Sequence, residues 1–340
     1  MEKNNPLISI CIPVFQTEPY LQACLDSVVA QDFSSFEVVI VSDASTGKDA
    51  KGRCAKKIVR DMQKKCRIVR KSKSLPPVKF HFIENNQNRG LIEVRRTLCT
   101  HAKGQYITQL DSDDQLEPGA LSALYEASQK GTIDIVHGTS IAGSFDENNN
   151  FIHSQMNRYG KILYEQISGQ DIFHRWLVNH EFTANTWGKI IRRELFIKSY
   201  EHIPYTECNM ADDVLLFFFL SQYAVSYVGI KNHVYRYRIN TGMSSRRKID
   251  TLHKWKMICS TASVFTIISQ WIQENQSEEF SIQSDELEII KAMTRFYLQN
   301  NIQQMQEAVI PELRTQAREM LCEYWGADFV RKMENQQLNK

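Results

Sequence analysis

The sequence contains no CxxC pair and no long hydrophobic run. Its eight cysteines are scattered, without the Cys/His spacing of a zinc site, which suits a reducing cytosol. The most apolar stretch, VLLFFFL at 214–220, is far too short to cross a bilayer. The first ten residues, MEKNNPLISI, lack the basic region and long apolar core of a signal peptide. Together these absences predict a cytoplasmic protein.

Net charge is also small. The chain has 41 Lys plus Arg against 39 Asp plus Glu, a formal charge of +2, which argues against a general nucleic-acid binder. The exception is the segment from Lys48 to Lys73, where basic residues far outnumber acidic ones. This segment is either a solvated helix face or a patch that faces anionic phospholipid or a phosphorylated lipid carrier. The second interpretation predicts a peripheral contact with the inner face of the membrane.

With 340 residues, 42% of them hydrophobic, the chain can bury a substantial core. Strand-like and helix-like segments alternate in its N-terminal part. Apolar, β-branched runs predict strands, and apolar residues at helical spacing predict the helices between them; the strands are expected at 7–15, 36–43, 78–85 and 105–111, and the helices at 18–31, within 48–73 and at 89–102. This alternation indicates a parallel α/β sheet. From about residue 250 the pattern is mainly helical, and a domain boundary is expected near 240–250.

Polar segments follow the four predicted strands at 15–17, 42–45, 85–88 and 111–114. Because ligands bind at the carboxyl ends of the strands in such sheets, we expect these segments to gather on one edge. Asp111 and Asp113 could then converge on Mg²⁺ or Mn²⁺, which prefer oxygen ligands. The alternative is an Asp-rich turn that caps a helix opening near Pro118. Asp43 would either bind a nucleobase or ribose, or begin a turn.

Two stretches in this region resemble the inverting glycosyltransferases of family 2, which have the GT-A fold. They read ISICIPVFQTEPYLQACLDSVVAQDFSSFEVVIVSDAST (8–46) and NRGLIEVRRTLCTHAKGQYITQLDSDDQLEPGAL (88–121), and order and spacing match over about residues 7–130. Three later segments are similar to the branch that builds bacterial surface polysaccharides: NTWGKIIRRELF (185–196), MADDVLLFFFL (210–220) and VYRYRINTGMSS (234–245).

The resemblance implies an α/β fold of the GT-A type, a mostly parallel sheet flanked by helices, with a mainly helical C-terminal region. The expected division is a glycosyltransferase domain at 1–245, with a nucleotide-binding half (1–130) and an acceptor half (131–245), followed by helices at 246–340. The implied reaction is a metal-dependent, inverting transfer of a sugar from a nucleotide donor, expected to be UDP-linked, to a glycan or lipid-linked acceptor.

The resemblance also assigns roles to residues. Donor binding falls to Pro13, Phe15, Asp43, Arg95, Asp111 and Arg238, the metal (Mn²⁺ or Mg²⁺) to Asp111 and Asp113, and the catalytic base to Asp213. Asp43 would contact the uracil, and Arg238 or His233 the leaving phosphates. This chain departs from the family pattern at Gln16, Ser42, Ala44, Arg96 and Asp212. Ser42 and Arg96 are the larger changes, and they bear on the nucleotide more than on the reaction.

Three alternatives remain open from the sequence. A sugar nucleotidyltransferase would ordinarily carry a Gly-rich phosphate loop after its first strand, where this chain reads PVFQTEPY. A non-catalytic nucleotide-sugar-binding protein would not depend on Asp213. Among the aromatic residues, Tyr235 and Tyr237 are expected to pack along a strand, whereas Trp187 is either a buried anchor or a platform for a sugar.

Overall fold

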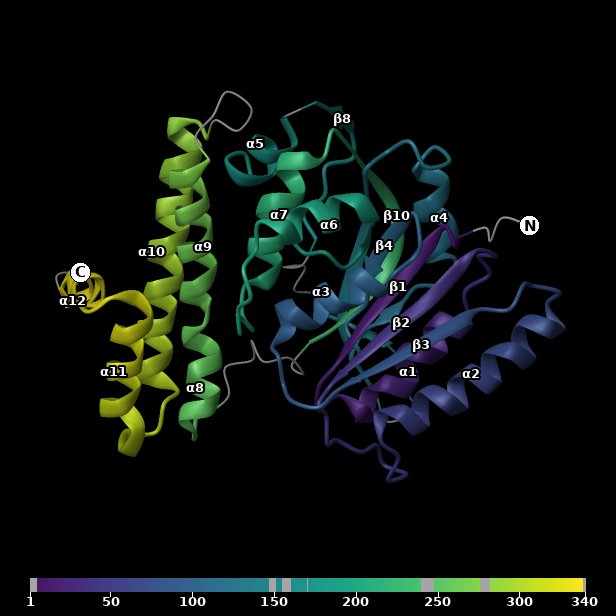
Figure 1. Cartoon of the computed structure of the whole chain (residues 1–340), viewed down its shortest axis with the longest axis horizontal. Helices are drawn as coiled ribbons and strands as arrows, with labels where there is room; N and C mark the ends of the chain where they lie inside the picture. The colour runs from purple at the N-terminus through teal and green to yellow at the C-terminus, as the bar shows by residue number, and fades with distance from the viewer. Residues whose placement is uncertain are drawn as a thin grey trace.

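A computed structural model of the chain describes residues 5–146, 151–154, 160–169, 171–239, 248–275 and 282–338. Its centre is one mixed β-sheet, with helices on both faces and a group of helices at the C-terminal end (Figure 1). The strands are β1 (Ile8–Val14), β2 (Phe36–Asp43), β3 (Lys79–Asn85), β4 (Tyr106–Gln109), β5 (Gln115–Leu116), β6 (Ile135–Phe145), β7 (Phe151–His153), β8 (Gln166–Ser168), β9 (Lys189–Arg192) and β10 (Ser226–Arg238).

The strand order is β3-β2-β1-β4-β9-β6-β10-β5, with β7 beside β6 and β8 beside β10. Strands β3, β2, β1 and β4 are parallel, as the alternating pattern predicts. The sheet then changes direction, because β9 is antiparallel to both β4 and β6, while β6 and β10 are again parallel. The mostly parallel α/β sheet is therefore confirmed, and the second half of the sheet is mixed.

Helices cover both faces of the sheet. They are α1 (Glu18–Val29), α2 (Ala55–Ser72), α3 (Leu91–His101), α4 (Ala120–Ala127), α5 (Asp171–Leu177), α6 (Arg193–Glu201), α7 (Asp212–Tyr223), α8 (Leu252–Cys259), α9 (Thr261–Glu274), α10 (Ser284–Glu307), α11 (Arg314–Trp325) and α12 (Ala327–Leu338), with a 3₁₀ turn at Pro311–Leu313. Alternate residues of a strand point to opposite faces. Ile10 of β1 accordingly joins the core under α1, α2 and α4, and its neighbour Cys11 joins the core under α3, α5, α6 and α7.

Helix α7 is buried on all sides, which explains its continuous apolar sequence. Phe217, Phe218 and Phe219 are each at most 1% exposed. Phe217 packs against Trp176 and Phe182, while Phe218 and Phe219 both pack edge-on against Trp271 of α9 at 5.5 Å between ring centres. The helix is thus held between the sheet domain and the C-terminal helices.

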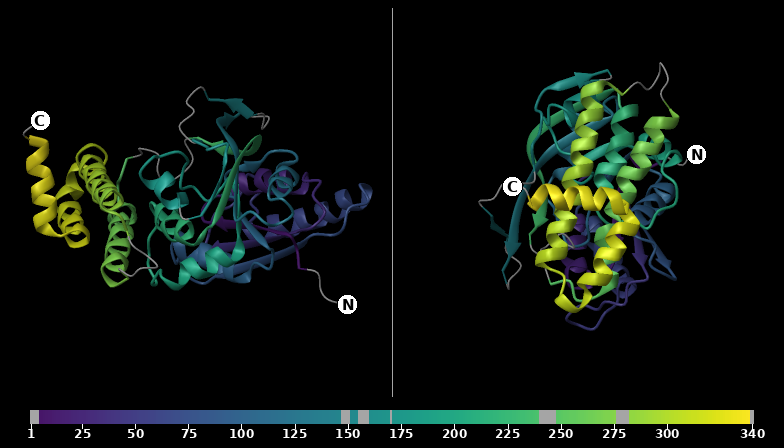
Figure 2. Two further views of the ribbon diagram at one scale, coloured as in Figure 1. Left: turned by 90° about the horizontal axis from the view of Figure 1, so that it is seen from above. Right: turned by 90° about the vertical axis from the view of Figure 1, so that its left-hand side faces the viewer.

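The C-terminal helices stand at one end of the molecule, at the opposite end from α2 (Figure 2). Residues of α9 and Ile290 of α10 belong to the same apolar core as β1 and α7. A third core joins α8, the later part of α10, α11 and α12, with Trp255, Leu298, Leu321 and Val330 inside it. The predicted boundary at 245 falls within 240–247, outside the described residues, so the division into domains stays a prediction.

Candidate active site

The polar segments after the parallel strands meet at one edge of the sheet, as predicted. Val14 at the end of β1 is level with Ser42 of β2, and Asp43 is level with Asn85 of β3. Just beyond the strands, the hydroxyls of Thr17 and Ser112 lie 2.6 Å apart. The strand tips thus form one continuous polar edge, assembled from segments nearly one hundred residues apart in the chain.

The Asp111–Asp114 loop is held from beneath by β10. The hydroxyl of Tyr235 donates to Asp114 Oδ2 (2.8 Å) and accepts the backbone N–H of Asp111 (3.1 Å). Arg238 donates its backbone N–H to Asp114 Oδ1 (2.6 Å) and its Nε to the carbonyl of Asp113 (2.9 Å). The aspartates do not cap the next helix, because the N-cap of α4 is Gly119 and makes no side-chain capping bond. The helix-cap alternative for this loop is therefore wrong.

The same loop has the electrostatics of a cation site. Burial raises the pKa of Asp114 well above its usual value, and the negative charges of Asp113 and Asp111 raise it further. Burial and the same three carboxylates raise the pKa of the Cys24 thiol. Among the described residues no three metal-ligating side chains are placed to hold an ion unaided. Two carboxylates of this loop would suit Mg²⁺ or Mn²⁺ if water and phosphate oxygens completed the coordination shell, and metal binding here stays a prediction.

Arg95 of α3 connects this loop to the start of α7. Its guanidinium is buried and donates to Thr186 Oγ1 (2.6 Å) and to Asp111 Oδ1 (3.1 Å), and its Nε lies 3.2 Å from Asp212 Oδ2. Burial alone would lower the pKa of Arg95, but the carboxylates of Asp212 and Asp111 outweigh it and raise that pKa. The guanidinium is thus already engaged by three protein groups, Thr186, Asp111 and Asp212. The donor-binding role of Arg95 stays a prediction.

Asp212 and Asp213 open α7 beside Arg95. The residue before them, Ala211, has a left-handed backbone (φ 58°), a conformation that is uncommon for a non-glycine residue and is often found at functional sites. Burial raises the pKa of Asp212 to about 6, with Arg95 opposing and Asp213 adding to the rise. Burial also raises the pKa of Asp213. Arg95, the hydrogen bond from the Val214 N–H and Lys189 each lower that pKa and so oppose the rise. A raised pKa strengthens a carboxylate as a proton acceptor.

Lys189 is a functional-site neighbour that the sequence reasoning missed. Its side chain is fully buried, donates to the carbonyls of Thr183 (3.0 Å) and Asn185, and lies 5.5 Å from the ring centre of Phe217. Burial lowers the pKa of its ammonium well below the usual value, although the negative charge of Asp213 raises that pKa in part. The available signal was a lysine inside the apolar segment NTWGKII, where a charged side chain has to find buried partners.

Trp187, two residues before β9, and two tyrosines of β10 form an aromatic stack beneath the loop. Trp187 is 9% exposed and stacks on Tyr235 (4.9 Å between ring centres) and Tyr237 (5.4 Å). The two tyrosines thus pack along the strand, as expected, and Trp187 is a buried anchor. The sugar-platform alternative for Trp187 loses its basis, since little of the ring is accessible.

Asp43 lies at the predicted strand tip, but its carboxylate is already engaged. It accepts Asn85 Nδ2 (2.8 Å), the Arg89 N–H (3.0 Å to each oxygen) and the Gly90 N–H (3.2 Å). Gly90 has φ 85°, and a Cβ there would lie 3.3 Å from the backbone of Glu207, so the turn favours glycine. Asp43 therefore orders the loop at 85–90, and its contact with uracil stays a prediction.

The remaining predicted donor residues lie around the same edge. Pro13 is in β1, and Phe15 follows it with 37% of its surface exposed. Arg238 lies over the ring of Tyr20 at 4.8 Å, and burial lowers its pKa. The exposed His233 is five residues away along β10, about 16 Å at strand spacing. Arg238 is thus the better placed of the two for a phosphate.

Arg96, the family departure nearest the nucleotide side, points away from the strand tips. Its guanidinium pairs with Glu93 and donates to the carbonyls of Tyr200 (2.8 Å), Ile203 (2.7 Å) and Pro204 (3.3 Å). It therefore clamps the segment after α6, and the departure at this position bears on local structure.

Comparisons with known proteins identify the family of the chain. The family model described as Glycosyl transferase family 2 matches residues 9–199. Glycosyltransferase GlyA of Streptococcus pneumoniae is 27% identical over 243 residues, 70% of this chain but only 31% of GlyA, so the match spans less than a third of that protein. Glycosyltransferase GlyG of the same organism is 24% identical over 251 residues, 72% of this chain and 75% of GlyG.

Among solved structures, the mannosyltransferase PcManGT from Pyrobaculum calidifontis, in complex with GDP-Man and Mn²⁺, superposes with a TM-score of 0.52. The two chains are 15% identical, and the superposition covers 99% of this chain and 88% of the other. At this identity the likeness concerns the fold, and it agrees with the predicted GT-A architecture.

Proposed function

The chain belongs to glycosyl transferase family 2 and is a glycosyltransferase, and we propose that it transfers a sugar with inversion from a UDP-linked donor to a glycan or lipid-linked acceptor in polysaccharide biosynthesis. The observation that carries this proposal is the bridge made by Arg95. It ties the partly exposed Asp111 to the buried Asp212, so the predicted metal side and the predicted base side belong to one connected cluster.

Each carboxylate has a separate task in the proposed reaction. Asp113, helped by Asp111, would hold Mn²⁺ or Mg²⁺, which supplies positive charge for the departing nucleoside diphosphate. Arg238, bonded to the Asp113 carbonyl, adds a second positive charge on the same side. Asp213 accepts the proton of the attacking hydroxyl, whose own pKa is far above neutrality. One base and one leaving group make a single displacement, which inverts the anomeric centre.

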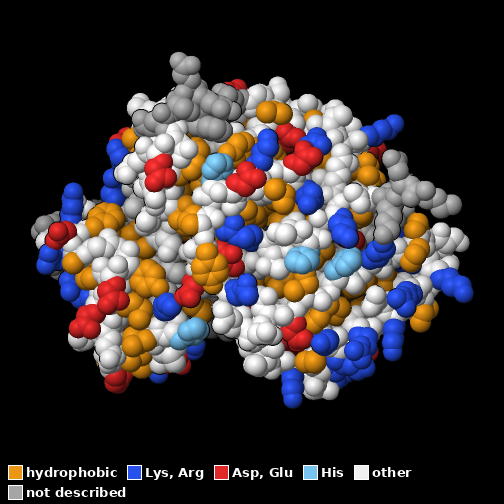
Figure 3. All heavy atoms as spheres, in the orientation of Figure 1, with side chains coloured by type: hydrophobic (Ala, Val, Ile, Leu, Met, Phe, Trp, Pro, Cys, Tyr) orange, Lys and Arg blue, Asp and Glu red, His pale blue; other side chains and the backbone are white. Residues whose placement is uncertain are grey.

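The α2 surface supports the further proposal that the enzyme works at an anionic membrane. Lys and Arg side chains gather over α2 at the lower right of Figure 3. Several are paired, such as Lys56 with Glu84 and Lys65 with Asp26, whereas the exposed residues Lys64 and Arg67 flank Ile68, which is 71% exposed. An exposed apolar side chain among cations suits a lipid headgroup layer. Among the described residues, no helix is both long and apolar enough to span a bilayer.

A test of the donor site uses thermal stabilisation by nucleotides with and without Mn²⁺. A ligand that binds only the folded state at one hundred times its Kd stabilises by about 2.7 kcal/mol. We expect UDP to stabilise the protein in the presence of Mn²⁺, and Asp113→Ala to abolish that effect with the fold intact. The matched control is Asp328→Ala, since Asp328 is a largely exposed aspartate at the far end of the chain. Undiminished metal-dependent UDP binding by Asp113→Ala would contradict the proposal.

A further inference from the structure

The C-terminal helices form a long groove that the proposed reaction does not use. One hollow of about 530 Å³ lies between α9 and α10 on one side and α12 on the other, and a second of about 480 Å³ continues it toward α11. The two share Ser269, Thr294 and Phe329 as lining residues. Along α9 the lining extends from Ala262 to Gln273, about 16 Å at helical rise. The groove is therefore longer than a single sugar ring.

One end of the groove carries aromatic surface. Trp325 and Phe329 are both partly exposed there, and Trp325 stacks on the buried ring of Phe265 at 6.1 Å between centres. Aromatic rings offer flat apolar surface, which suits the C–H face of a sugar. Amide and hydroxyl side chains, among them Gln270 and Thr266, line the same hollow and supply donors and acceptors for sugar hydroxyls.

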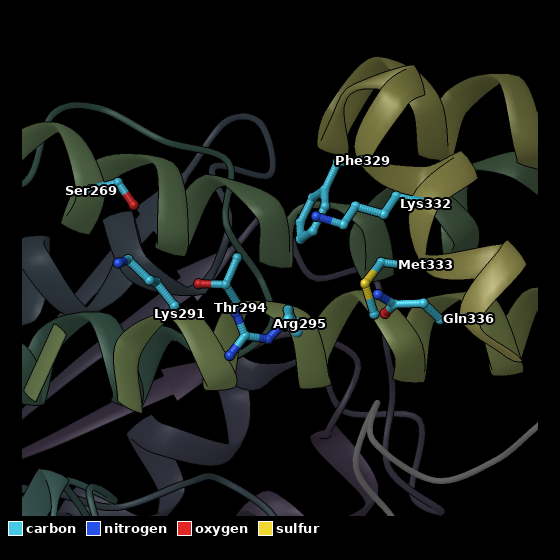
Figure 4. A pocket seen from close by; sticks show the side chains of 8 residues that line it. All are labelled: Ser269, Lys291, Thr294, Arg295, Phe329, Lys332, Met333 and Gln336. Atoms are coloured by element: carbon cyan, nitrogen blue, oxygen red, sulfur yellow. The ribbon is translucent and has the colours of Figure 1, made fainter. Parts of the chain in front are cut away.

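The other end is cationic. Lys291, Arg295 and Lys332 line it, and the close-up shows Phe329 and Lys332 directed from α12 toward α10 (Figure 4). Lys291 pairs with Glu288 at 2.8 Å; because the ion pair is exposed, it is weak and competes little with a ligand for the ammonium of Lys291. No acidic residue stands among the described residues that line the two hollows. The site therefore favours a ligand with negative charge.

We propose that this groove binds an acidic glycan chain, with carboxylate or phosphate substituents at the cationic end and sugar rings against the aromatic end. This inference rests on the proposed function, because a transferase that extends a polysaccharide has such a chain as its acceptor or product. An apolar helix is a poorer fit, since hydroxyls and amides interrupt the aromatic surface. Lipid is also a poorer fit, because amides, hydroxyls and cations line the groove in place of a continuous apolar surface.

The groove and the predicted base lie on opposite sides of the same helices. Lys291, Thr294 and Arg295 are spaced i, i+3 and i+4 and line the groove from α10. Ile290 and Tyr297 are seven positions apart on another face, which packs against the core that contains α7. Burial raises the pKa of Tyr297, and Asp213 and Asp212 raise it further, so this face lies near the base. A glycan in the groove would thus lie across α9 and α10 from the core that contains α7.

The first test measures binding to the whole chain by calorimetry. The probes are an oligogalacturonate of about ten residues, a maltodextrin of the same length and a polyglutamate of similar charge. We expect the oligogalacturonate to bind most tightly and to weaken as salt is added. The double variant Arg295→Gln/Lys332→Gln should bind it about tenfold more weakly, while Phe329→Ala should weaken both saccharides. The matched control is Arg331→Gln, because Arg331 lies on α12, pairs with Asp328 and is not among the lining residues.

The second test separates this inference from the proposed function. Transfer of the sugar to a short acceptor, measured as release of UDP, should be unchanged in the double variant, whereas the KM for a long acidic acceptor should rise. If the unmodified protein showed no sugar transfer at all, the proposed function would be wrong. Binding of the oligogalacturonate would still show whether the groove holds an acidic glycan. Equal binding of acidic and neutral saccharides, or unchanged binding by the double variant, would overturn the inference. Preference for polyglutamate would also overturn it and would assign the groove to an acidic protein segment.

Discussion

Replacing Arg95 by Met tests whether the buried cluster depends on one cation. Methionine keeps most of the side chain's volume and removes the charge and all five N–H donors. Asp212, which is 6% exposed, then loses its counter-charge, and Thr186 and Asp111 lose a donor each. Breaking a buried ion pair from one side costs about 3–5 kcal/mol of folding free energy. We expect a loss of that size at pH 8.

The loss should shrink at pH 5, and the sign follows from the pKa of Asp212. That pKa is raised to about 6 in the folded protein, so the folded state binds more protons than the unfolded state, and stability falls as pH rises from about 4 through 6. Arg95 holds this pKa down, so its removal raises the pKa further and extends the fall to higher pH. Each additional pKa unit adds about 1.4 kcal/mol to the difference between the two pH values.

The assay is urea unfolding of the metal-free protein at pH 5 and pH 8, with Arg60→Met as the control. Arg60 is an exposed arginine of α2, and its replacement should change stability by less than about 0.5 kcal/mol at either pH. An equal loss of stability by the Arg95 variant at both pH values would show that the pKa of Asp212 does not depend on Arg95. A loss of stability no larger than that of the control would show that the Arg95 bridge does not stabilise the fold.

Two further predictions concern catalysis and the membrane. Asp213→Asn keeps the shape of the side chain but removes its basicity, so transfer measured as UDP release should fall about 10²-fold or more, while UDP binding stays nearly unchanged; near-normal turnover would move the base to Asp212. The protein should sediment with phosphatidylserine vesicles at low salt and dissociate as salt screens charge over about 8–10 Å, and substitution of Lys64, Arg67 and Ile68 should abolish this; equal recovery with neutral vesicles would leave α2 as a solvated face.

The parallel half of the fold could be predicted because its signals are local. Strands β1 and β2 are apolar runs, β3 alternates polar and apolar residues, and a polar segment follows each of the strands β1 to β4; the tips of parallel strands must share an edge. The mixed half gave no such signal, since β9 is only four residues long and is placed by pairing with β4 and β6. Pattern reasoning locates a strand by its own sequence, whereas register across a sheet is set by the partner strands.

For the candidate site, the sequence could name residues but not the direction of their side chains. Arg95 and Arg96 are neighbours on one helix, so they project about 100° apart, and only one faces the aspartates. Tyr235 was expected to pack, and it does, but its hydroxyl also binds Asp114. Lys189 had no expected role because a single lysine in an apolar segment does not reveal its partners. These are contacts between segments that are distant in the chain, and such contacts cannot be predicted from the local pattern of a single sequence.

Asp43 offers the sharpest separation between binding and folding. If it serves only a nucleobase, Asp43→Asn should leave the ligand-free protein as stable as before. The structure predicts otherwise, because Asn85 and the N–H groups of Arg89 and Gly90 all donate to this carboxylate, and asparagine replaces one acceptor oxygen by a donor. One of these buried donors then faces another donor, which costs about 1–3 kcal/mol. Urea unfolding without nucleotide measures it, with Asp32→Asn, an exposed aspartate, as the control. Unchanged stability together with lost UDP binding would indicate that Asp43 only binds ligand. A loss of stability would indicate that Asp43 orders the loop at 85–90, so that its effect on nucleotide binding acts through that loop.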